Sequence, residues 1–375
     1  MSAAMKASQA RNDHWGLAAK SCVEALGGLP EGANTGFVYV TEALGDDLPS
    51  IVTFLRETTA VADWLGGVGG GVFGPLGESH DGRAMALMVG RLPAGAVHPF
   101  DSFAAGDEGP FLQRHGGWLA GRAGVTGLVH GDPTDGAVAE AVAELSEAAN
   151  AFLFGGLTAV RATAAQVAGR MAAGTLSGAL FGAEVALATG LTQGCVPIGG
   201  NHLVTGAVEG VIMTLDGRPA LEVMRQEIGE PMARDLAKIA GTIHIARPIP
   251  GSDTHDYLVR GLQGIDPRHG WLAVGDSFDE GDRILFVRRD AQAAETDMRR
   301  MLKGLARRLD GRAIAGGIYV SCVARGPSMF GAEGRELDMI RDALGEFPLV
   351  GFSAGGEICH DRLYAYTGVL ALFLK

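Results

Sequence analysis

The sequence predicts an α/β (α+β) fold in which repeated strand-helix-strand-strand units form mixed sheets covered by helices, divided into two domains. Similar series of apolar strand-length and helix-length stretches recur in three parts of the chain, around 36–90, 127–187 and 317–374. Each part has glycines at the end of its second strand. The length of 375 residues exceeds what one simple core usually holds, which favours two domains.

The first unit follows an expected amphipathic helix and continues as strand, helix, glycine-rich turn and closing strand. These elements are expected at 15–27, 37–40, 48–55, 68–71 and 85–89. In the second helix, Leu48, Ile51, Val52 and Leu55 share one face, and Pro49 suits the first helical turn. The less regular stretch 91–125 is expected to be a loop crossing with a short helix at 99–105.

The middle unit shows the same order with a less regular end. A strand, a helix and two further strands are expected at 125–130, 138–145, 152–154 and 180–189. The stretch 158–173 is rich in alanine, the residue with the highest helix propensity, and is expected to be helical.

The last part begins with mixed elements and ends with the third unit. Asp216-Gly217 is a strong turn signal, so 208–224 is interpreted as a hairpin or a strand–turn–helix junction. A helix at 231–240 precedes four antiparallel strands, which are expected at 242–246, 257–260, 271–274 and 283–287. A long helix is expected at 291–309, because its methionines and leucines recur on one face.

Composition and charge exclude several classes of protein. Apolar residues make up 47% and charged residues 20%, which is typical of globular chains. The net charge of −12 argues against nucleic-acid and anionic-membrane partners, which are themselves negative. No apolar run reaches a membrane span and no signal peptide is expected, so a cytoplasmic location is predicted. The four cysteines have neither disulfide nor zinc spacing, so free and mostly buried thiols are expected, with no metal and no cofactor.

Four segments occur in an order typical of one family. They are QGCVPIG (193–199), LDGRPAL (215–221), CVARG (322–326) and GFSAGGEI (351–358). Together, over nearly the whole chain, they resemble the FIST family, with an N-terminal domain expected at 1–215 and a C-terminal domain at 216–375. One departure lies in the last segment, where Ser353-Ala354-Gly355 replaces the aromatic pair often found there. A wider or differently shaped pocket is therefore expected.

The resemblance implies a sensory, signal-transduction module that binds a small ligand, with amino acids and small carboxylates as the ligand classes. No output domain can be recognised in the sequence, so signalling is expected to pass through a separate protein partner. The resemblance does not imply an enzyme.

Arg325 and Glu357 are the leading candidates for ligand contacts. Glu357 follows Gly355 and Gly356 at a strand end, where it could accept a ligand ammonium or cap nearby backbone amides. The planar guanidinium of Arg325 would suit a ligand carboxylate, but it could equally pair with Glu357. Both alternatives are retained.

Cys195 and Cys322 each lie at a strand end and complete the candidate ligand-binding set with Arg325, Glu357, Gly355 and Gly356. Glycine runs could present backbone N–H groups to an anion, or only allow strands to bend. A catalytic thiol would need a nearby base, so buried structural thiols are favoured.

Two further functions remain as alternatives. Residues 351–355 fit the GxSxG pattern of hydrolases, but a strand-like tail follows where a helix is required. A hydrolase or acyl transferase using Ser353 or a cysteine would need a base close to the nucleophile. A protein-interaction scaffold would need a large exposed apolar patch.

Overall fold

The computed structural model describes residues 5–159, 166–229, 239, 241–249 and 257–375. The chain forms two compact units, and the first consists of 1–192 together with 298–375. The second unit, 193–297, interrupts the first. These units therefore do not follow the linear division expected at 215/216. The helix expected at 231–240 lies outside the described residues, except for position 239.

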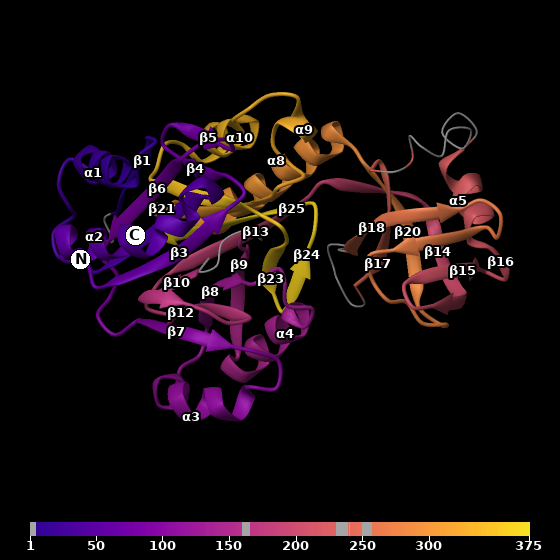
Figure 1. Ribbon diagram of the computed structural model, residues 1–375, viewed down its shortest axis with the longest axis horizontal. Helices are drawn as coiled ribbons and strands as arrows, with labels where there is room; N and C mark the ends of the chain where they lie inside the picture. Colours follow the sequence, from indigo (N-terminus) through magenta and orange to yellow (C-terminus); the bar gives the residue numbers. More distant parts are fainter. Residues whose placement is uncertain (1–4, 160–165, 230–238, 240, 250–256) are drawn as a thin grey trace. The chain divides into compact units, whose positions relative to one another are not determined.

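The first unit contains three six-stranded sheets with the same order of strand types (Figure 1). The first sheet runs β1 (Met5–Arg11), β6 (Ala84–Gly90), β2 (Thr35–Thr41), β3 (Asp63–Gly69), β10 (Gln166–Ala168) and β11 (Arg170–Ala172). The second runs β7 (Val97–Phe103), β12 (Leu176–Phe181), β8 (Val125–Gly131), β9 (Ala151–Leu157), β23 (Glu357–His360) and β24 (Arg362–Tyr364). The third runs β13 (Leu187–Gln193), β25 (Thr367–Leu374), β21 (Ile314–Cys322), β22 (Leu349–Ala354), β4 (Val72–Gly74) and β5 (Gly77–Ser79).

Each sheet is mixed, because one parallel pair lies between antiparallel neighbours. The parallel pairs are β2–β3, β8–β9 and β21–β22. A hairpin completes each sheet from another part of the chain: β10–β11 joins β3, β23–β24 joins β9, and β4–β5 joins β22. The exchange is cyclic, so each of the three repeated segments completes the sheet of another. The predicted fold class is confirmed.

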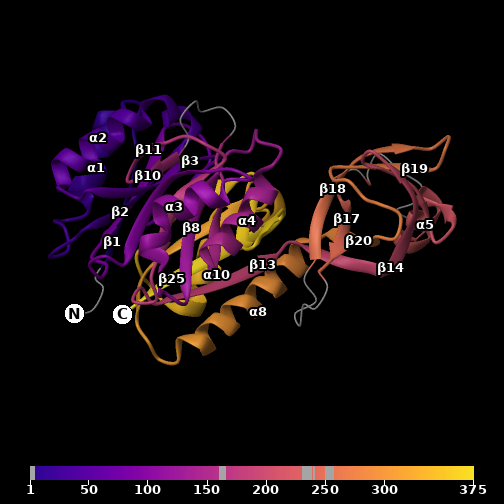
Figure 2. The same cartoon turned by 90° about the horizontal axis from the view of Figure 1, so that it is seen from below.

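Helices cover the outer face of each sheet. The first sheet carries α1 (Trp15–Ala25) and α2 (Leu48–Thr59), preceded by the 3₁₀ turn η1 (Glu42–Asp47), and the second carries α3 (Glu108–Leu119) and α4 (Val138–Ala149) (Figure 2). The third is covered by α10 (Arg335–Leu344) and by α8 (Ala291–Leu309) from Met298 onward, with the short α9 (Pro327–Phe330) nearby in sequence. The apolar stripe expected on 291–309 is the face that packs in this core.

The inner faces of the sheets meet one another through aromatic side chains. Phe37 of β2 lies 5.4 Å from Phe373 of β25, and Phe181 of β12 lies 6.0 Å from Phe373 (ring centroids). Val38 and Val40 point the other way, into the helix-covered core. Strands buried on both faces are expected to be continuously apolar, which is what β2, β6 and β25 show.

A second aromatic group lies among the same strands. Tyr39 stacks on Phe352 at 4.9 Å between ring centroids, and its hydroxyl lies 3.3 Å from Nε2 of His130. All three side chains are fully buried. Burial lowers the pKa of His130 to about 3, because a desolvated ring disfavours the charged form. The imidazole is therefore neutral.

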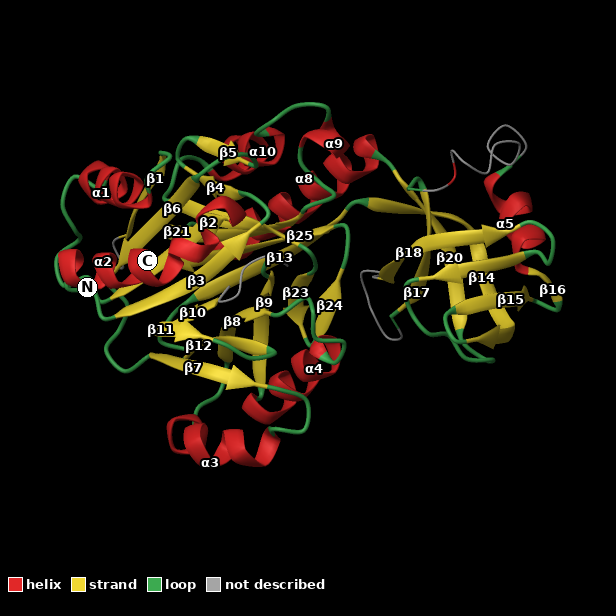
Figure 3. Ribbon diagram, viewed as in Figure 1, coloured by secondary structure: helices red, strands yellow, loops and turns green. Residues whose placement is uncertain are grey.

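The second unit is dominated by one antiparallel sheet (Figure 3). Its order is β14 (Cys195–Val208), β20 (Arg283–Arg289), β17 (Ile243–Pro248), β18 (Tyr257–Asp266), β19 (Trp271–Val274), β15 (Val211–Leu215) and β16 (Arg218–Pro219). The four predicted antiparallel strands are confirmed as β17 to β20. The strands β15 and β16 pair across the turn at Asp216 and Gly217. The helix α5 (Ala220–Ile228) follows, so 208–224 contains both the hairpin and the strand–turn–helix junction that were the alternatives.

Several local predictions are wrong. Residues 97–103 form the edge strand β7 rather than a helix at 99–105, and an edge strand tolerates Pro99. The described part of 158–173 forms the hairpin β10–β11, because pairing with β3 outweighs the helix propensity of alanine. The strand expected at 180–189 is interrupted between β12 and β13. The helix α3 and the strands β1 and β14 were not expected.

No helix among the described residues combines the length and hydropathy needed to cross a bilayer.

Candidate functional site

A buried ionic network lies where β21 ends and α10 begins. Arg325 follows β21, and its side chain is completely buried. Its Nε donates to Oε1 of Glu336 at 2.8 Å, and its Nη2 lies 2.7 Å from the same oxygen. Glu336 also accepts from the hydroxyls of Tyr319 and Ser321, both at 2.7 Å. The amphipathic α10 places Glu336 on its inner face, one turn before Ile340.

Glu357 lies beside this network at the first position of β23. The residue is fully buried, and its Oε2 accepts from the backbone N–H and the hydroxyl of Thr367 at 3.1 and 2.7 Å. The other oxygen, Oε1, has no hydrogen-bonding partner among the described residues. The thiol of Cys322 lies beside the carboxyl group, and its hydrogen bond lowers the pKa of Glu357 against the larger effect of burial. Most buried carboxylate oxygens accept a hydrogen bond, so this oxygen is a candidate contact for a further group.

The structure thus brings most of the predicted ligand-binding residues together. Arg325, Glu357 and Cys322 lie at one end of the third sheet, and Gly355 and Gly356 form the turn between β22 and β23. Arg325 forms its ion pair with Glu336, so the direct pair with Glu357 is not the observed arrangement. Cys195 begins β14 in the second unit, where its carbonyl accepts from the Tyr257 hydroxyl at 2.6 Å.

Glu357 should make stability depend on pH. Desolvation raises the pKa of Glu357 to about 8, although Thr367 and Arg325 oppose the shift. The folded state therefore binds the proton more tightly than the unfolded state, whose carboxyl has an ordinary pKa. The stabilisation is fully present below about pH 4.5 and is lost as the pH rises toward 8. We expect the wild type to lose up to about 1.4 kcal/mol of unfolding free energy per pH unit relative to Glu357→Gln in this window. Chemical unfolding of both proteins at several pH values measures this difference in unfolding free energy. Parallel pH profiles for the two proteins would contradict the raised pKa of Glu357.

The thiols should be chemically silent in the folded protein. All four cysteines are free and buried, and burial raises the pKa of Cys22 and of Cys322 to about 12. Thiolate is the reactive form, so Cys22 and Cys322 have almost none at pH 8. We expect an aromatic disulfide reagent to titrate less than one thiol per native chain and all four after denaturation. A rapidly reacting thiol in the native chain that Cys322→Ser removes would be inconsistent with this expectation.

Ser353 has a histidine in its surroundings. A Cβ added at Gly71 would lie 2.6 Å from Nδ1 of His80 and 3.2 Å from Oγ of Ser353, so both side chains adjoin this glycine. His80 Nε2 lies 2.9 Å from Oε2 of the buried Glu78, and this contact raises the pKa of His80. The two residues belong to or follow the β4–β5 hairpin, which pairs with β22, so the fold brings them to Ser353.

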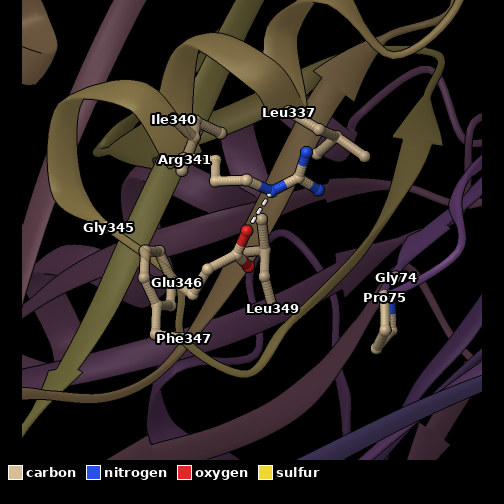
Figure 4. A pocket seen from close by; sticks show the side chains of 9 residues that line it. All are labelled: Gly74, Pro75, Leu337, Ile340, Arg341, Gly345, Glu346, Phe347 and Leu349. Carbon is tan, nitrogen blue, oxygen red and sulfur yellow. Dashed lines mark ion pairs between the residues drawn. The ribbon is translucent and has the colours of Figure 1, made fainter.

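A small cavity of about 100 Å³ lies near the other end of β22 (Figure 4). Its apolar lining includes Leu337, Phe347 and Leu349, with Pro75 across from them. The ion pair Arg341–Glu346, 2.7 Å long, lies at its side. None of the predicted site residues lines this cavity. Among the described residues, no group of histidine, cysteine and acidic side chains is arranged to hold a metal ion.

The sequence did not indicate Glu336, Thr367 or His80 as site residues. The position of Glu336 on the apolar face of an amphipathic helix was a usable signal, because a carboxylate there must be paired. The approach of His80 to Ser353 had no sequence signal, because it depends on the exchange of hairpins between the repeated segments.

Comparison with known proteins identifies the family. The FIST N domain matches residues 34–218, and the FIST C domain matches 220–360. The boundary between the two matches lies inside the second compact unit.

Relatives come from mycobacteria. An uncharacterised protein of Mycobacterium tuberculosis strain H37Rv is 39% identical over 197 residues, which cover 49% of this chain and 50% of that protein. An uncharacterised protein of Mycobacterium bovis is 37% identical over 198 residues, with the same coverage. The chain therefore matches about half the length of these relatives. From the two domain matches, the chain belongs to the FIST family, whose domains are associated with sensory signal transduction.

Proposed function

We propose that this protein is a cytoplasmic sensor that binds a small amino acid or related carboxylate at Glu357 and Arg325 and signals through a separate protein partner. The single observation behind the proposal is the fully buried Glu357, with one carboxylate oxygen lacking a partner, close to a buried guanidinium. A buried ionisable pair with a strongly shifted pKa is typical of functional sites.

The two groups suit the two ends of an amino acid. Oε1 of Glu357 would accept the ligand ammonium, because that oxygen has no partner among the described residues. Arg325 directs Nε and Nη2 at Glu336, but its Nη1 makes only a long 3.4 Å contact with the Tyr366 carbonyl. Nη1 is therefore the atom that would bind the ligand carboxylate. Glu336 would hold the guanidinium in place.

Access to Glu357 would involve the turn at Gly355 and Gly356. Gly355 is exposed, and a Cβ added there would contact nothing within 4 Å. The turn joins β22 to β23, which pair with different sheets. A movement of this turn on ligand binding would be transmitted to both sheets, which is how a sensor could report occupancy.

A thermal-shift screen of the full chain with the proteinogenic amino acids and short carboxylates tests the proposal. At least one ligand should raise the unfolding midpoint in a concentration-dependent manner, by about 2.7 kcal/mol of stabilisation at one hundred times its Kd. Glu357→Gln keeps the shape but should abolish the shift. Gly355→Ala is the control, because it adds a methyl group in open space at the turn. It should keep the shift of the wild type. A screen without any shift, or an equal shift in Glu357→Gln, would refute this site.

A hydrolase using Ser353 is a second candidate, favoured by the Glu78–His80 pair beside that serine. His80 would take the Ser353 proton as general base, and Glu78 would stabilise the imidazolium. A fluorophosphonate probe should then label the wild type, while Ser353→Ala and His80→Gln should not be labelled. Absence of labelling at millimolar probe would reject this candidate and leave the ligand-binding proposal unaffected.

A further inference from the structure

A second cavity lies at the opposite end of β21 from Arg325 and Glu357. It has a volume of about 780 Å³, within the range of about 300–1,000 Å³ that is usual for ligand pockets. Arg312 precedes β21 and lines this cavity, whereas Arg325 follows the strand. The nine residues of β21 separate the two places by roughly 30 Å. The cavity is therefore a different site from the one proposed above.

All three sheets contribute to this cavity. Its walls come from residues after β6 and β12, from the end of β25, and from residues before β2 and β21. The Asn34 amide donates to the Leu92 carbonyl and accepts from the Leu92 N–H, both at 2.9 Å. The N–H of Leu374 donates to the Ala186 carbonyl at 2.9 Å. These bonds join segments that are distant in sequence, so the cavity is formed before any ligand binds.

The lining combines apolar and charged residues. Phe373 belongs to the lining and is held by Phe37 and Phe181. The charged lining residues are Glu31, Arg91, Glu184, Arg312 and Lys375. Glu184 is paired with Arg122 at 3.1 Å, which removes much of its charge from the cavity. The lining therefore carries three cationic and two acidic side chains, in a chain whose net charge is −12.

We infer that this cavity binds a small organic anion with an apolar body, whose carboxylate or phosphate group contacts Arg312. The Arg312 side chain is exposed and forms no ion pair or hydrogen bond with a described residue, so its donors are available. A planar guanidinium binds carboxylate and phosphate oxygens through two parallel bonds. The apolar body would lie against Phe373 and Val185.

Titration calorimetry of the full chain with phenylacetate, phenyl phosphate and the neutral phenylacetamide tests the inference. At least one of the anions should bind, with affinity that falls as salt rises, and phenylacetamide should bind at least tenfold more weakly. The stronger of the two anions identifies the head group. Binding of neither anion, or equal binding of phenylacetamide, would overturn the inference.

Variants locate the binding site. Arg312→Gln should weaken anion binding by about tenfold or more, which is the loss expected for a hydrogen bond to a charged group. Arg307→Gln is the matched control, because Arg307 is an exposed arginine of α8 outside the lining. Ala94→Trp places a bulky side chain in the lining and should weaken binding without changing the unfolding midpoint. Unchanged affinity in both Arg312→Gln and Ala94→Trp would overturn the inference.

Glu357→Gln separates this inference from the proposed sensor function. That substitution should leave anion binding at Arg312 intact, because it lies at the other end of β21. Loss of anion binding in Glu357→Gln, with Arg312→Gln unaffected, would place the anion at the first site and overturn the inference.

Discussion

Replacing Gly351 with alanine should cost at least about 3 kcal/mol of unfolding free energy, or prevent folding altogether. A Cβ at this position would overlap the carbonyl oxygen of Tyr319 on the neighbouring parallel strand. That atom belongs to the backbone of a central strand, so it cannot move without disturbing the sheet. Gly66 and Gly155 occupy the same place in the other two sheets, opposite Val38 and Val129, and show the same overlap. Their alanine variants should be destabilised comparably.

Gly355→Ala is the matched control for Gly351→Ala. The two glycines lie four residues apart, but a Cβ at Gly355 would contact nothing within 4 Å. Chemical denaturation followed by circular dichroism should show a near-wild-type midpoint for Gly355→Ala and a large loss for Gly351→Ala. Equal midpoints for the two variants would contradict the close strand approach.

Arg325→Met should destabilise the protein by about 3–5 kcal/mol, because it leaves the buried Glu336 carboxylate without its counter-charge. The hydroxyls of Tyr319 and Ser321 would still donate to Glu336, but they supply no net charge. The double variant Arg325→Met, Glu336→Gln should recover part of the loss, since it removes the buried charge. Urea unfolding of the two single variants and the double variant measures the coupling.

An exposed ion pair at the end of α10 is the control for Arg325→Met. Arg341 pairs with Glu346 at 2.7 Å, but the two side chains are 43% and 78% exposed. Arg341→Met should therefore cost less than about 1 kcal/mol. Similar losses for Arg325→Met and Arg341→Met would show that the buried network does not contribute as described.

Local patterns in the sequence predicted helices with one apolar face and strands that form a short apolar run. The helix at 291–309 and the strands at 243–248 and 283–289 are of these kinds. The hairpin β10–β11 was mistaken for a helix, because its conformation is decided by pairing with β3, about one hundred residues earlier in the chain. Pairing between distant segments leaves no local periodicity.

Only part of the candidate site was predictable, because some of its side chains come from segments that are distant in the sequence. Arg325 and Glu357 follow strands of one sheet and could be placed at its end from the sequence. Glu336 reaches Arg325 from a helix, and His80 reaches Ser353 on a hairpin that belongs to another unit. The large cavity lined by Arg312 combines segments from both ends of the chain, so no short segment could indicate it.

The central claim is that the Glu357 carboxylate binds the ammonium group of an amino acid, and proton release on binding tests it most directly. Because the pKa of Glu357 is raised to about 8, the carboxyl is mostly protonated at pH 7, and it must lose that proton to hold an ammonium group. Calorimetry in two buffers of different ionisation enthalpy should show about one proton released per amino acid bound to the wild type. Glu357→Gln should neither bind the amino acid nor release a proton. Saturable binding of the same amino acid with equal proton release in both proteins would contradict the assignment of the ligand to Glu357.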